Sequence, residues 1–362
     1  MVDEMEALRS RLTAFVDENF RVVTPGIAIL VKGRGFDFLY WNGSIDKLNF
    51  SYDRGTLFDL ASLTKPVVTA TLTLKMVELG KLSLEDSLES VGLYKAGTEA
   101  ARLTIRELIT HTSGLIPTYP LYNYGKSKQD YIRTIGLMHE RRLMPITEEY
   151  SDLNYILLGF VLEQLSGKPL DELARDLIFS PLSMKNTSFN PEVSKEEIAP
   201  TEEDPERGGL VWGKVHDEKA FYLGGVAGHA GLFSNIDDLG KYMDAFLSGK
   251  IVSRSTLKTM ISPQNLAIGG MFGLGWMIKT PRPAVPSPAY GYSAFMGELS
   301  PYGTFGHTGF TGTSICADPL SGIYSIILAN RVYPSRENNA ILRFRRLFHN
   351  MVFSGALQEQ IK

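Results

Sequence analysis

Strand-like runs lie near both ends of this 362-residue chain, and helix-rich sequence separates them. Residues 27–31 and 36–41 are β-rich and are joined by a turn with two glycines, which predicts a hairpin. Residues 303–317 and 322–330 are also strand-like, with a turn between them. Because both ends of the chain supply strands, we expect an α+β fold in which one antiparallel β-sheet is flanked by helices.

The helical patterns divide the chain into a sheet domain and an inserted helical subdomain. We expect residues 1–80 and 236–362 to form the sheet domain and residues 81–235 to form the all-helical subdomain. Apolar residues recur at helical spacing over residues 4–19, and residues 336–353 have the pattern of a closing helix. Helices from both chain ends would therefore flank the sheet.

Local signals mark several segments of the expected subdomain. Thr104 begins a capping box, and residues 155–165 form an apolar helix that Gly167 ends. Residues 192–209 are charged and rich in proline and glycine, which predicts a solvated connector without regular structure.

The composition limits the partners that this chain can have. With 37 Lys and Arg, 40 Asp and Glu and a net charge of −3, the chain lacks the basic run that binds nucleic acid, so no nucleic-acid partner is expected. Cys316 is the only cysteine, which excludes an intrachain disulfide and a cysteine-based metal cluster. We expect it to be a small buried residue of a strand.

The N-terminal segment bears on the location of the protein. Residues 1–6 are acidic where a signal peptide needs positive charge, no apolar export core follows, and no stretch reaches transmembrane length. We therefore expect a cytoplasmic protein without a membrane span. A chain from which a leader had been removed would have the same sequence and would be exported.

A Ser-x-x-Lys segment, Ser62 to Lys65, opens a run that is apolar nearly all round and ends at Gly80, as expected for a buried helix. Positions i and i+3 share a helix face, so the hydroxyl and the amine would be neighbours. Burial lowers the pKa of a lysine, which would let the neutral amine accept the serine proton. The alternative is an N-cap serine and a surface lysine. A second match, Ser255 to Lys258, is expected on an exposed helix without a role in catalysis.

Three further segments occur in the order found in a known family. Tyr150-Ser151-Asp152 precedes an apolar helix, His307-Thr308-Gly309 lies on a C-terminal strand, and residues 103–115 lie between the first and second motifs. The chain thereby resembles the serine β-lactamase superfamily, in the branch of class C β-lactamases, D-alanyl-D-alanine carboxypeptidases and family VIII esterases. The resemblance runs from about residue 15 to residue 353, and residues 199–234 are similar to a β-lactamase-related subgroup.

The resemblance implies a β-lactamase/transpeptidase-like fold and a role for each motif. Ser62 would be the acylated nucleophile, Lys65 its activating base, and Tyr150 the proton relay for the leaving group and later for the hydrolytic water. The backbone N–H groups of Ser62 and Phe310 would form the oxyanion hole. No cofactor is implied. Substrate contacts would come from Asp152, His307, Thr308 and Gly309.

Two positions depart from the family pattern. Asp152 stands where the family usually has asparagine, and an ionised carboxylate there would favour a charged Lys65 and disfavour a tyrosinate at Tyr150. His307 stands where β-lactamases generally have lysine, a permanent cation for the substrate carboxylate, whereas histidine is mostly neutral at pH 7. Family members with His-Thr-Gly include carboxypeptidases and esterases, so strong β-lactamase activity is less expected.

The predicted function is therefore that of a serine hydrolase that forms an acyl-enzyme with carboxylic esters or small amides. Acyl esters and D-amino-acid peptides are the leading small-molecule substrates. One alternative is a β-lactamase or a penicillin-binding protein with slow deacylation. An alternative of another class is a non-catalytic binding or scaffolding relative, for which Asp152 leaves room.

The remaining histidines indicate no metal site, because none pairs at ligand spacing with a second histidine or a carboxylate cluster. We expect His111 to be buried and hydrogen-bonded, and His139 and His349 to lie on the surface. His216 and His229 either contact the pocket or support a glycine-rich turn.

Two tyrosine-containing loops could wall the substrate groove or lie on the surface. The first contains Tyr119, Tyr122 and Tyr124. The second is the stretch 281–302, with Tyr290 and Tyr292.

Overall fold

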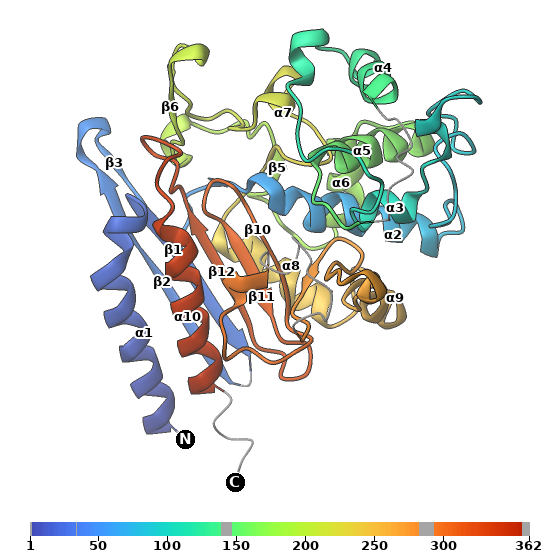
Figure 1. The fold of residues 1–362 in the computed structure, drawn as a ribbon. Helices are drawn as coiled ribbons and strands as arrows, with labels where there is room; N and C mark the ends of the chain where they lie inside the picture. The colour runs from blue at the N-terminus through green and yellow to red at the C-terminus, as the bar shows by residue number, and fades with distance from the viewer. Residues whose placement is uncertain (1, 34, 139–146, 282–292, 357–362) are drawn as a thin grey trace.

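A seven-stranded antiparallel sheet forms the centre of the molecule in the computed structural model, which describes residues 2–33, 35–138, 147–281 and 293–356 (Figure 1). Its strand order is β3-β2-β1-β12-β11-β10-β9. The strands are β1 Gly26–Gly33, β2 Phe36–Ile45, β3 Phe50–Ser51, β9 Met277–Ile278, β10 Phe305–Thr308, β11 Ser314–Ala317 and β12 Tyr324–Ala329.

The two ends of the chain meet in the middle of this sheet. β1 pairs with β2 as the predicted hairpin, and it pairs on its other side with β12, with Ile27 opposite Ala329 and Ile29 opposite Ile327. The prediction of an α+β fold built on one antiparallel sheet is therefore confirmed. The run 303–317 forms two strands, β10 and β11, with a turn between them that reaches the site described below.

Helices α1 (Val2–Val23) and α10 (Ala340–Ala356) lie side by side on one face of the sheet (Figure 1). Successive side chains of a strand point to opposite faces, so Ile27, Ile29 and Val31 of β1 pack against this helix pair. The rings of Phe15 and Phe344 lie 5.3 Å apart between the two helices. The predicted N-terminal and closing helices are thus present.

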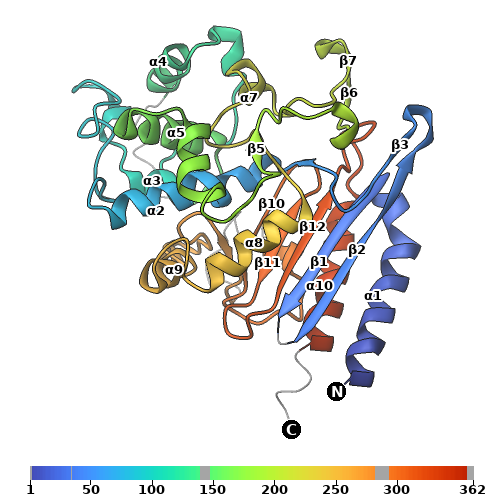
Figure 2. The same cartoon turned by 180° about the vertical axis from the view of Figure 1, so that it is seen from behind.

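The opposite face of the sheet is covered by α8 (Ile236–Leu247), with α9 (Arg254–Met260) at its edge (Figure 2). Ala28 and Leu30 of β1 face this side. Gly240 permits close packing, because a Cβ there would lie 2.9 Å from Leu30 Cδ2. The Tyr324 hydroxyl donates to Asp244 Oδ1 at 2.9 Å and ties the sheet to α8.

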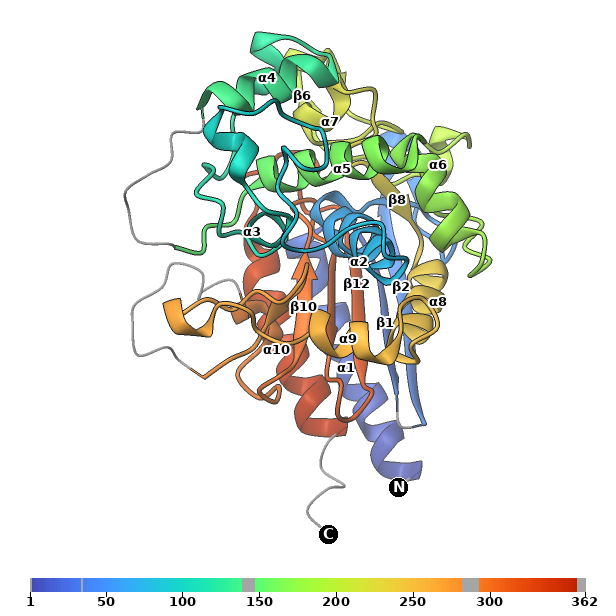
Figure 3. The same cartoon turned by 90° about the vertical axis from the view of Figure 1, so that its right-hand side faces the viewer.

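The helix-rich part of the chain lies beyond one end of the sheet (Figure 3). α2 and α5 are buried there, as their apolar sequences predict, and the capping box at Thr104 is present. Two small sheets, β4-β8-β5 and β6-β7, also belong to this part. Its helices are α2 Thr71–Glu78, α3 Ile105–Ile109, α4 Lys128–Met138, α5 Asp152–Ser166, α6 Leu170–Ala174 and α7 Glu218–Tyr222, and its strands are β4 Phe58–Asp59, β5 Ser188–Phe189, β6 Glu203–Asp204, β7 Gly209–Leu210 and β8 Leu232–Ser234.

Two predictions made from local sequence are wrong. The segment 192–209 has regular structure, because β6 pairs with β7 and the Glu203 N–H donates to Pro334 O at 2.9 Å. His349 is fully buried rather than exposed, since it lies on the inner side of α10. Its Nδ1 is 2.7 Å from Phe295 O and its Nε2 is 3.2 Å from Ser325 Oγ, which satisfies the buried imidazole.

Other expectations about single residues are confirmed or fall outside the described residues. Cys316 is a buried free thiol in β11. His139, Tyr290 and Tyr292 lie outside the described residues. Of the helices described, none is both long and apolar enough to cross a membrane.

Candidate functional site

Ser62 lies in a 3-10 turn, Ala61–Leu63, that leads through a π-helical turn, Lys65–Ala70, into α2. Ala61 has a φ of 47°, which is uncommon for a residue other than glycine. Its N–H donates to Asp59 Oδ1 at 2.8 Å, and Asp59 Oδ2 accepts the N–H of His216 at 2.6 Å. The buried Asp59 side chain therefore holds the strained turn that presents Ser62.

Lys65 is fully buried and lies between the serine and the second motif. Its Nζ is 2.8 Å from Ser62 Oγ and 2.8 Å from Asp152 Oδ1, and it also donates to His229 O at 3.2 Å. The alternative of a surface lysine behind an N-cap serine is therefore excluded. All three hydrogen-bonding positions of one ammonium group are used.

The charges of this cluster favour an ion pair at rest. Burial alone would lower the pKa of Lys65, but the negative charge of Asp152 beside it outweighs burial and raises it. Burial opposes ionisation of Asp152, but Lys65 and Lys219 hold the pKa of this carboxyl at about 2. The sequence predicted two opposite effects on Lys65: burial lowers its pKa, and Asp152 favours its charged form. The effect of Asp152 prevails, so Lys65 is an ammonium that donates to Ser62.

Tyr150 stands beside this ion pair in the chain segment that precedes α5. Lys65 Nζ lies 4.9 Å from the centroid of its ring, and the ring of His111 lies 4.6 Å from it on another side. Burial raises the pKa of Tyr150 although Lys65 opposes this, so the hydroxyl is neutral at rest. His111 is buried, as predicted, and its Nδ1 accepts the Ser151 N–H at 3.1 Å, which positions the motif.

Glu148, which carried no signal in the sequence, fixes the other end of this segment. It is 3% exposed, and its carboxyl accepts the N–H groups of Met271 at 2.7 Å and Phe272 at 3.2 Å. The ring of Phe272 in turn stacks on Tyr150 at 6.1 Å. Tyr150 is thus held by contacts from two sides.

His307 lies on β10 with its ring 5.8 Å from that of Tyr150. Burial, with the nearby charge of Lys65, lowers the pKa of His307 to about 3, so the imidazole is neutral at pH 7, as expected. Its Nδ1 lies 2.9 Å from Thr308 O, an acceptor, so Nδ1 carries the proton and Nε2 does not. The third motif therefore supplies no cation here.

The turn after β10 is fastened to the residues that precede Ser62. The Thr311 hydroxyl donates to Asp59 O at 2.7 Å, and the Thr313 hydroxyl donates to Leu60 O at 2.9 Å. Gly309 allows this approach, because a Cβ at this position would overlap Leu60 O. Phe310, which follows Gly309, is thereby carried to the same opening as Ser62.

Two cavities meet at Ser62, Tyr150 and Phe310. The larger has a volume of about 480 Å³, and the smaller has about 250 Å³. The larger cavity is lined by Tyr119, Tyr122, Asp152, His216, Lys219 and Arg336, among others. The smaller is lined by Met277, Thr308, Gly309, Arg331, Asn339 and Arg345, among others.

Of the predicted site residues, Lys65 and His307 are buried beside the cleft and the others line it, and the first tyrosine loop forms part of its wall. Tyr119 and Tyr122 line the larger cavity, whereas Tyr124 is 53% exposed and its hydroxyl accepts from that of Tyr119 at 2.7 Å. His216 lines the same cavity, and His229 lies fully buried behind it.

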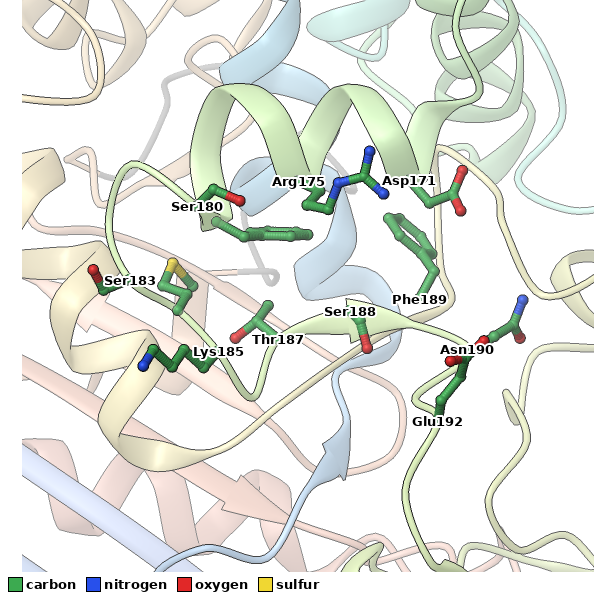
Figure 4. A pocket seen from close by; sticks show the side chains of 12 residues that line it. Asp171, Arg175, Ser180, Ser183, Lys185, Thr187, Ser188, Phe189, Asn190 and Glu192 are labelled. Carbon is green, nitrogen blue, oxygen red and sulfur yellow. The ribbon is translucent and has the colours of Figure 1, made fainter.

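A separate cavity of about 670 Å³ lies along the outer side of α6 and β5 (Figure 4). All of its lining residues come from the single stretch 171–192, and its charged groups include Arg175, Lys185 and Glu192. The Arg175 guanidinium is paired with Asp176 at 3.2 Å. Among its described lining residues the Thr187 hydroxyl donates to the buried Asp238 at 3.1 Å, but no hydroxyl is paired with a lysine or a histidine, so the larger volume does not indicate an active site.

Three side chains lie behind Asp152. Only His229 was a candidate for pocket contact from the sequence, and Lys219 and Asp217 were not identified. Lys219 Nζ lies 3.3 Å from Asp152 Oδ2 and 3.2 Å from Asp217 Oδ2, and His229 Nε2 lies 2.8 Å from Asp217 Oδ1. The ligand atoms of Asp152, Asp217 and His229 lie within 4.8 Å of one another, close enough to hold a metal ion. The two ammonium groups already neutralise both carboxylates, and a cation there would be repelled by Lys65 and Lys219.

Comparison with known proteins gives a consistent picture. The family model described as "Beta-lactamase" matches residues 12–349. A protein of Escherichia coli (strain K12) named "Putative D-alanyl-D-alanine carboxypeptidase" is 33% identical over 314 residues, which cover 76% of this chain and 69% of that protein. The protein of the same name from Salmonella gallinarum is 31% identical, with 88% and 80% covered.

Solved structures with the same fold span several activities. EstCE1, "a hydrolase with promiscuous acyltransferase activity", matches with a TM-score of 0.74 at 19% identity, covering 98% of this chain and 100% of that one. The D-amino acid amidase of Ochrobactrum anthropi matches with a TM-score of 0.72 at 20% identity, covering 98% and 99%. At this identity the likeness shows the fold, and the predicted fold class is confirmed by it.

Proposed function

The chain belongs to the β-lactamase family, and from this premise we propose that it is a serine hydrolase of the D-amino-acid carboxypeptidase type, acting on small amides and esters through an acyl-enzyme. One observation carries the proposal: buried Lys65 lies 2.8 Å from both Ser62 Oγ and Asp152 Oδ1 at the point where two cavities meet. A nucleophile and a base thus lie together, with a cavity for substrate on each side of Ser62.

In the proposed acylation step, Ser62 Oγ attacks the carbonyl carbon while its proton passes to the pair formed by Lys65 and Tyr150. Because Lys65 is an ammonium at rest, the pair must first lose a proton to solvent, so the rate rises with pH. The oxyanion that forms is placed between the N–H groups of Ser62 and Phe310. Tyr150 returns the proton to the leaving group and then accepts one from the water that releases the acyl chain.

The smaller cavity supports a substrate with a free carboxylate. Arg331 and Arg345 line it, and no carboxylate occurs among its described lining residues. Burial, with the charge of Arg331, lowers the pKa of Arg345 to about 9, so this guanidinium is still charged at pH 7. A buried cation without a carboxylate partner favours an anionic ligand. The proposed leaving group is therefore an amino acid whose carboxylate lies near Thr308 and these arginines. The arginines would supply the positive charge that a lysine generally supplies in β-lactamases, at the position where this chain has His307.

The test uses a D-alanyl-D-alanine peptide, a p-nitrophenyl ester and a chromogenic cephalosporin, with turnover and intact protein mass followed for each. We expect turnover of the peptide and the ester, and a Ser62→Ala variant should lose on the order of 10³-fold or more in kcat. Ser255→Ala is the matched control, since it changes the serine of the exposed Ser-x-x-Lys segment, and it should retain full activity.

Each alternative gives a different result in this test. Covalent adduct without turnover indicates a penicillin-binding protein with slow deacylation, and fast turnover of the cephalosporin alone indicates a β-lactamase. No adduct and no turnover with any probe, or an active Ser62→Ala variant, would refute the proposed hydrolase.

A further inference from the structure

The charged groups behind Ser62 form a closed chain of contacts. Asp152 contacts Lys65 through Oδ1 and Lys219 through Oδ2, Lys219 contacts Asp217, and Asp217 contacts the imidazole of His229. The backbone carbonyl of His229 accepts from Lys65 at 3.2 Å and closes the ring. Two ammonium groups thus face two carboxylates, so the ring has no net charge when the imidazole is neutral.

Lys219 is built into this ring rather than extended into solvent. The residue is 7% exposed, and besides the two carboxylates its Nζ donates to Thr118 Oγ1 at 3.1 Å. It comes from α7, whose N-cap is Asp217: the Asp217 side chain accepts the Ala220 N–H at 2.9 Å. One aspartate therefore fixes both the start of the helix and the lysine that the helix carries.

A second cation at Asp152 changes what the carboxylate does to Lys65. Asp152 alone would hold Lys65 in its charged form, in which it cannot accept the proton of Ser62. Lys219 divides the attraction of the carboxylate between two cations and repels a proton on Lys65 directly. We propose that Lys219 is a positioning residue that makes Lys65 easier to deprotonate, and that Asp217 and His229 hold Lys219 in place. This inference rests on the proposed function, in which Lys65 must lose its proton before Ser62 reacts.

The other titratable groups around Lys65 are neutral near pH 7, so the ring sets the local charge. Burial lowers the pKa values of His111 and His307 and raises those of Tyr150 and Tyr155. Burial would lower the pKa of Lys219, but Asp217 and Asp152 outweigh it and raise this pKa, so Lys219 keeps its charge throughout. The groups that face Lys65 or Lys219 are Asp152, Tyr150, Tyr155, His111, His307, His229, Asp217, Tyr122 and Tyr131.

The first test is the pH profile of p-nitrophenyl acetate hydrolysis by Lys219→Met and Lys219→Gln, two variants that remove the charge with different polarity. The midpoint of the rising limb should move up by about one pH unit or more, which lowers the rate at pH 7 about tenfold. Lys219→Arg should restore most of the profile. The double variant with Lys219→Met and Asp152→Asn should have a lower midpoint than Lys219→Met alone, since it lacks the carboxylate that holds Lys65 in its charged form.

Lys241→Met is the matched control for the loss of a paired lysine. Lys241 Nζ lies 2.6 Å from Asp238 Oδ1 on α8, away from the cleft, so this variant should keep the profile of the parent. If Lys219→Met only weakened the fold, the rate would fall at every pH with the midpoint unchanged, and the proposal would be overturned.

The second test does not depend on turnover. The side-chain ammonium of Lys65 is titrated by ¹⁵N NMR in the parent, Lys219→Met and Lys219→Gln, with the signal assigned by its loss in Lys65→Met. A higher midpoint in the Lys219 variants supports the inference even if the parent hydrolyses none of the probes, an outcome that refutes only the proposed function. Equal midpoints in parent and variants refute the inference even if the parent is an active hydrolase.

Discussion

Three Ser-x-x-Lys segments occur in the chain, and the surroundings of two of them, Ser62 to Lys65 and Ser255 to Lys258, differ. In the first, Lys65 is fully buried and contacts both Ser62 and Asp152. In the second, Ser255 and Lys258 are exposed on α9, and Lys258 has no ion pair within the described part of the chain. The spacing alone brings a hydroxyl and an amine to one helix face, but only the first segment removes them from water and sets the charge of the amine.

The helices that carry the two segments explain this difference. The first segment enters a helix that α5 and the loop with His229 cover, so the lysine must find its partners inside the protein. The second lies on a short helix at the edge of the molecule, capped by Ser253 through the Thr256 N–H. There the lysine is solvated. Burial with a carboxylate partner, rather than the motif itself, therefore distinguishes a candidate base from a surface lysine.

Removing each lysine should give the largest difference between the segments. Lys65→Met deletes the base and leaves Asp152 without one of its two cations, so the kcat for p-nitrophenyl acetate should fall on the order of 10³-fold. Lys258→Met should retain the parental kcat. Initial rates at pH 8 with both variants, checked for folding by circular dichroism, measure this. Equal losses in the two variants would show that the buried segment has no special role.

The stability of the protein should separate the same two segments. Asp152→Ala removes the carboxylate that the buried Lys65 contacts and leaves Lys219 with Asp217, and we expect the free energy of unfolding to fall by about 3–5 kcal/mol. Lys258→Ala should change it by less than about 0.5 kcal/mol. Urea unfolding of both variants provides the comparison. A small loss in Asp152→Ala would mean that water or Asp217 compensates the two lysines.

The fold and the nucleophile could be predicted because both depend on short-range patterns. Two β-rich runs joined by a glycine-containing turn identified β1 and β2, and the all-round apolar run after Ser62 indicated a buried helix. The partners of Lys65 are harder to predict, because Lys219 and His229 lie more than 150 residues along the chain and neither has a periodic signal. The hairpin at 203–210 was missed for the same reason: its ordering contact, Pro334, is distant in sequence.

The turn that carries Gly309 and Phe310 lies next to Ser62 and not next to Ser255, and a methyl group added at Gly309 should displace it. Gly309→Ala would place a Cβ against Leu60 O and Thr313 Oγ1, so the turn with Phe310 must move away from Ser62. We expect a loss of about 1–3 kcal/mol in the free energy of unfolding and a lower kcat. Gly55→Ala is the matched control, since its nearest contact would be 3.4 Å away, at Asp53 Oδ1. Equal behaviour of the two variants would show that the turn adapts without cost to the site.

The smallest expected effect is the response of the buried ion pair to acid. The pKa of Asp152 in the folded protein is about 2, against an ordinary value of 3.8, so its ionised form stabilises the fold. This contribution is present above pH 4 and is lost as the pH falls from about 4 to about 2, for a total of about 2 kcal/mol. The measurement is the difference in free energy of unfolding between the parent and Asp152→Asn, followed from pH 6 downward.

The acid response also sharpens the contrast between the two lysines. The difference between parent and Asp152→Asn should be constant from pH 6 to about 4 and then shrink by about 1.4 kcal/mol per pH unit. Lys258 is exposed, so adding Lys258→Met to both proteins should leave this curve unchanged. A difference that instead grew as the pH fell from 6 to 4 would mean that Asp152 is protonated in the folded protein, and Lys65 would then be free to act as a neutral base without help from Lys219.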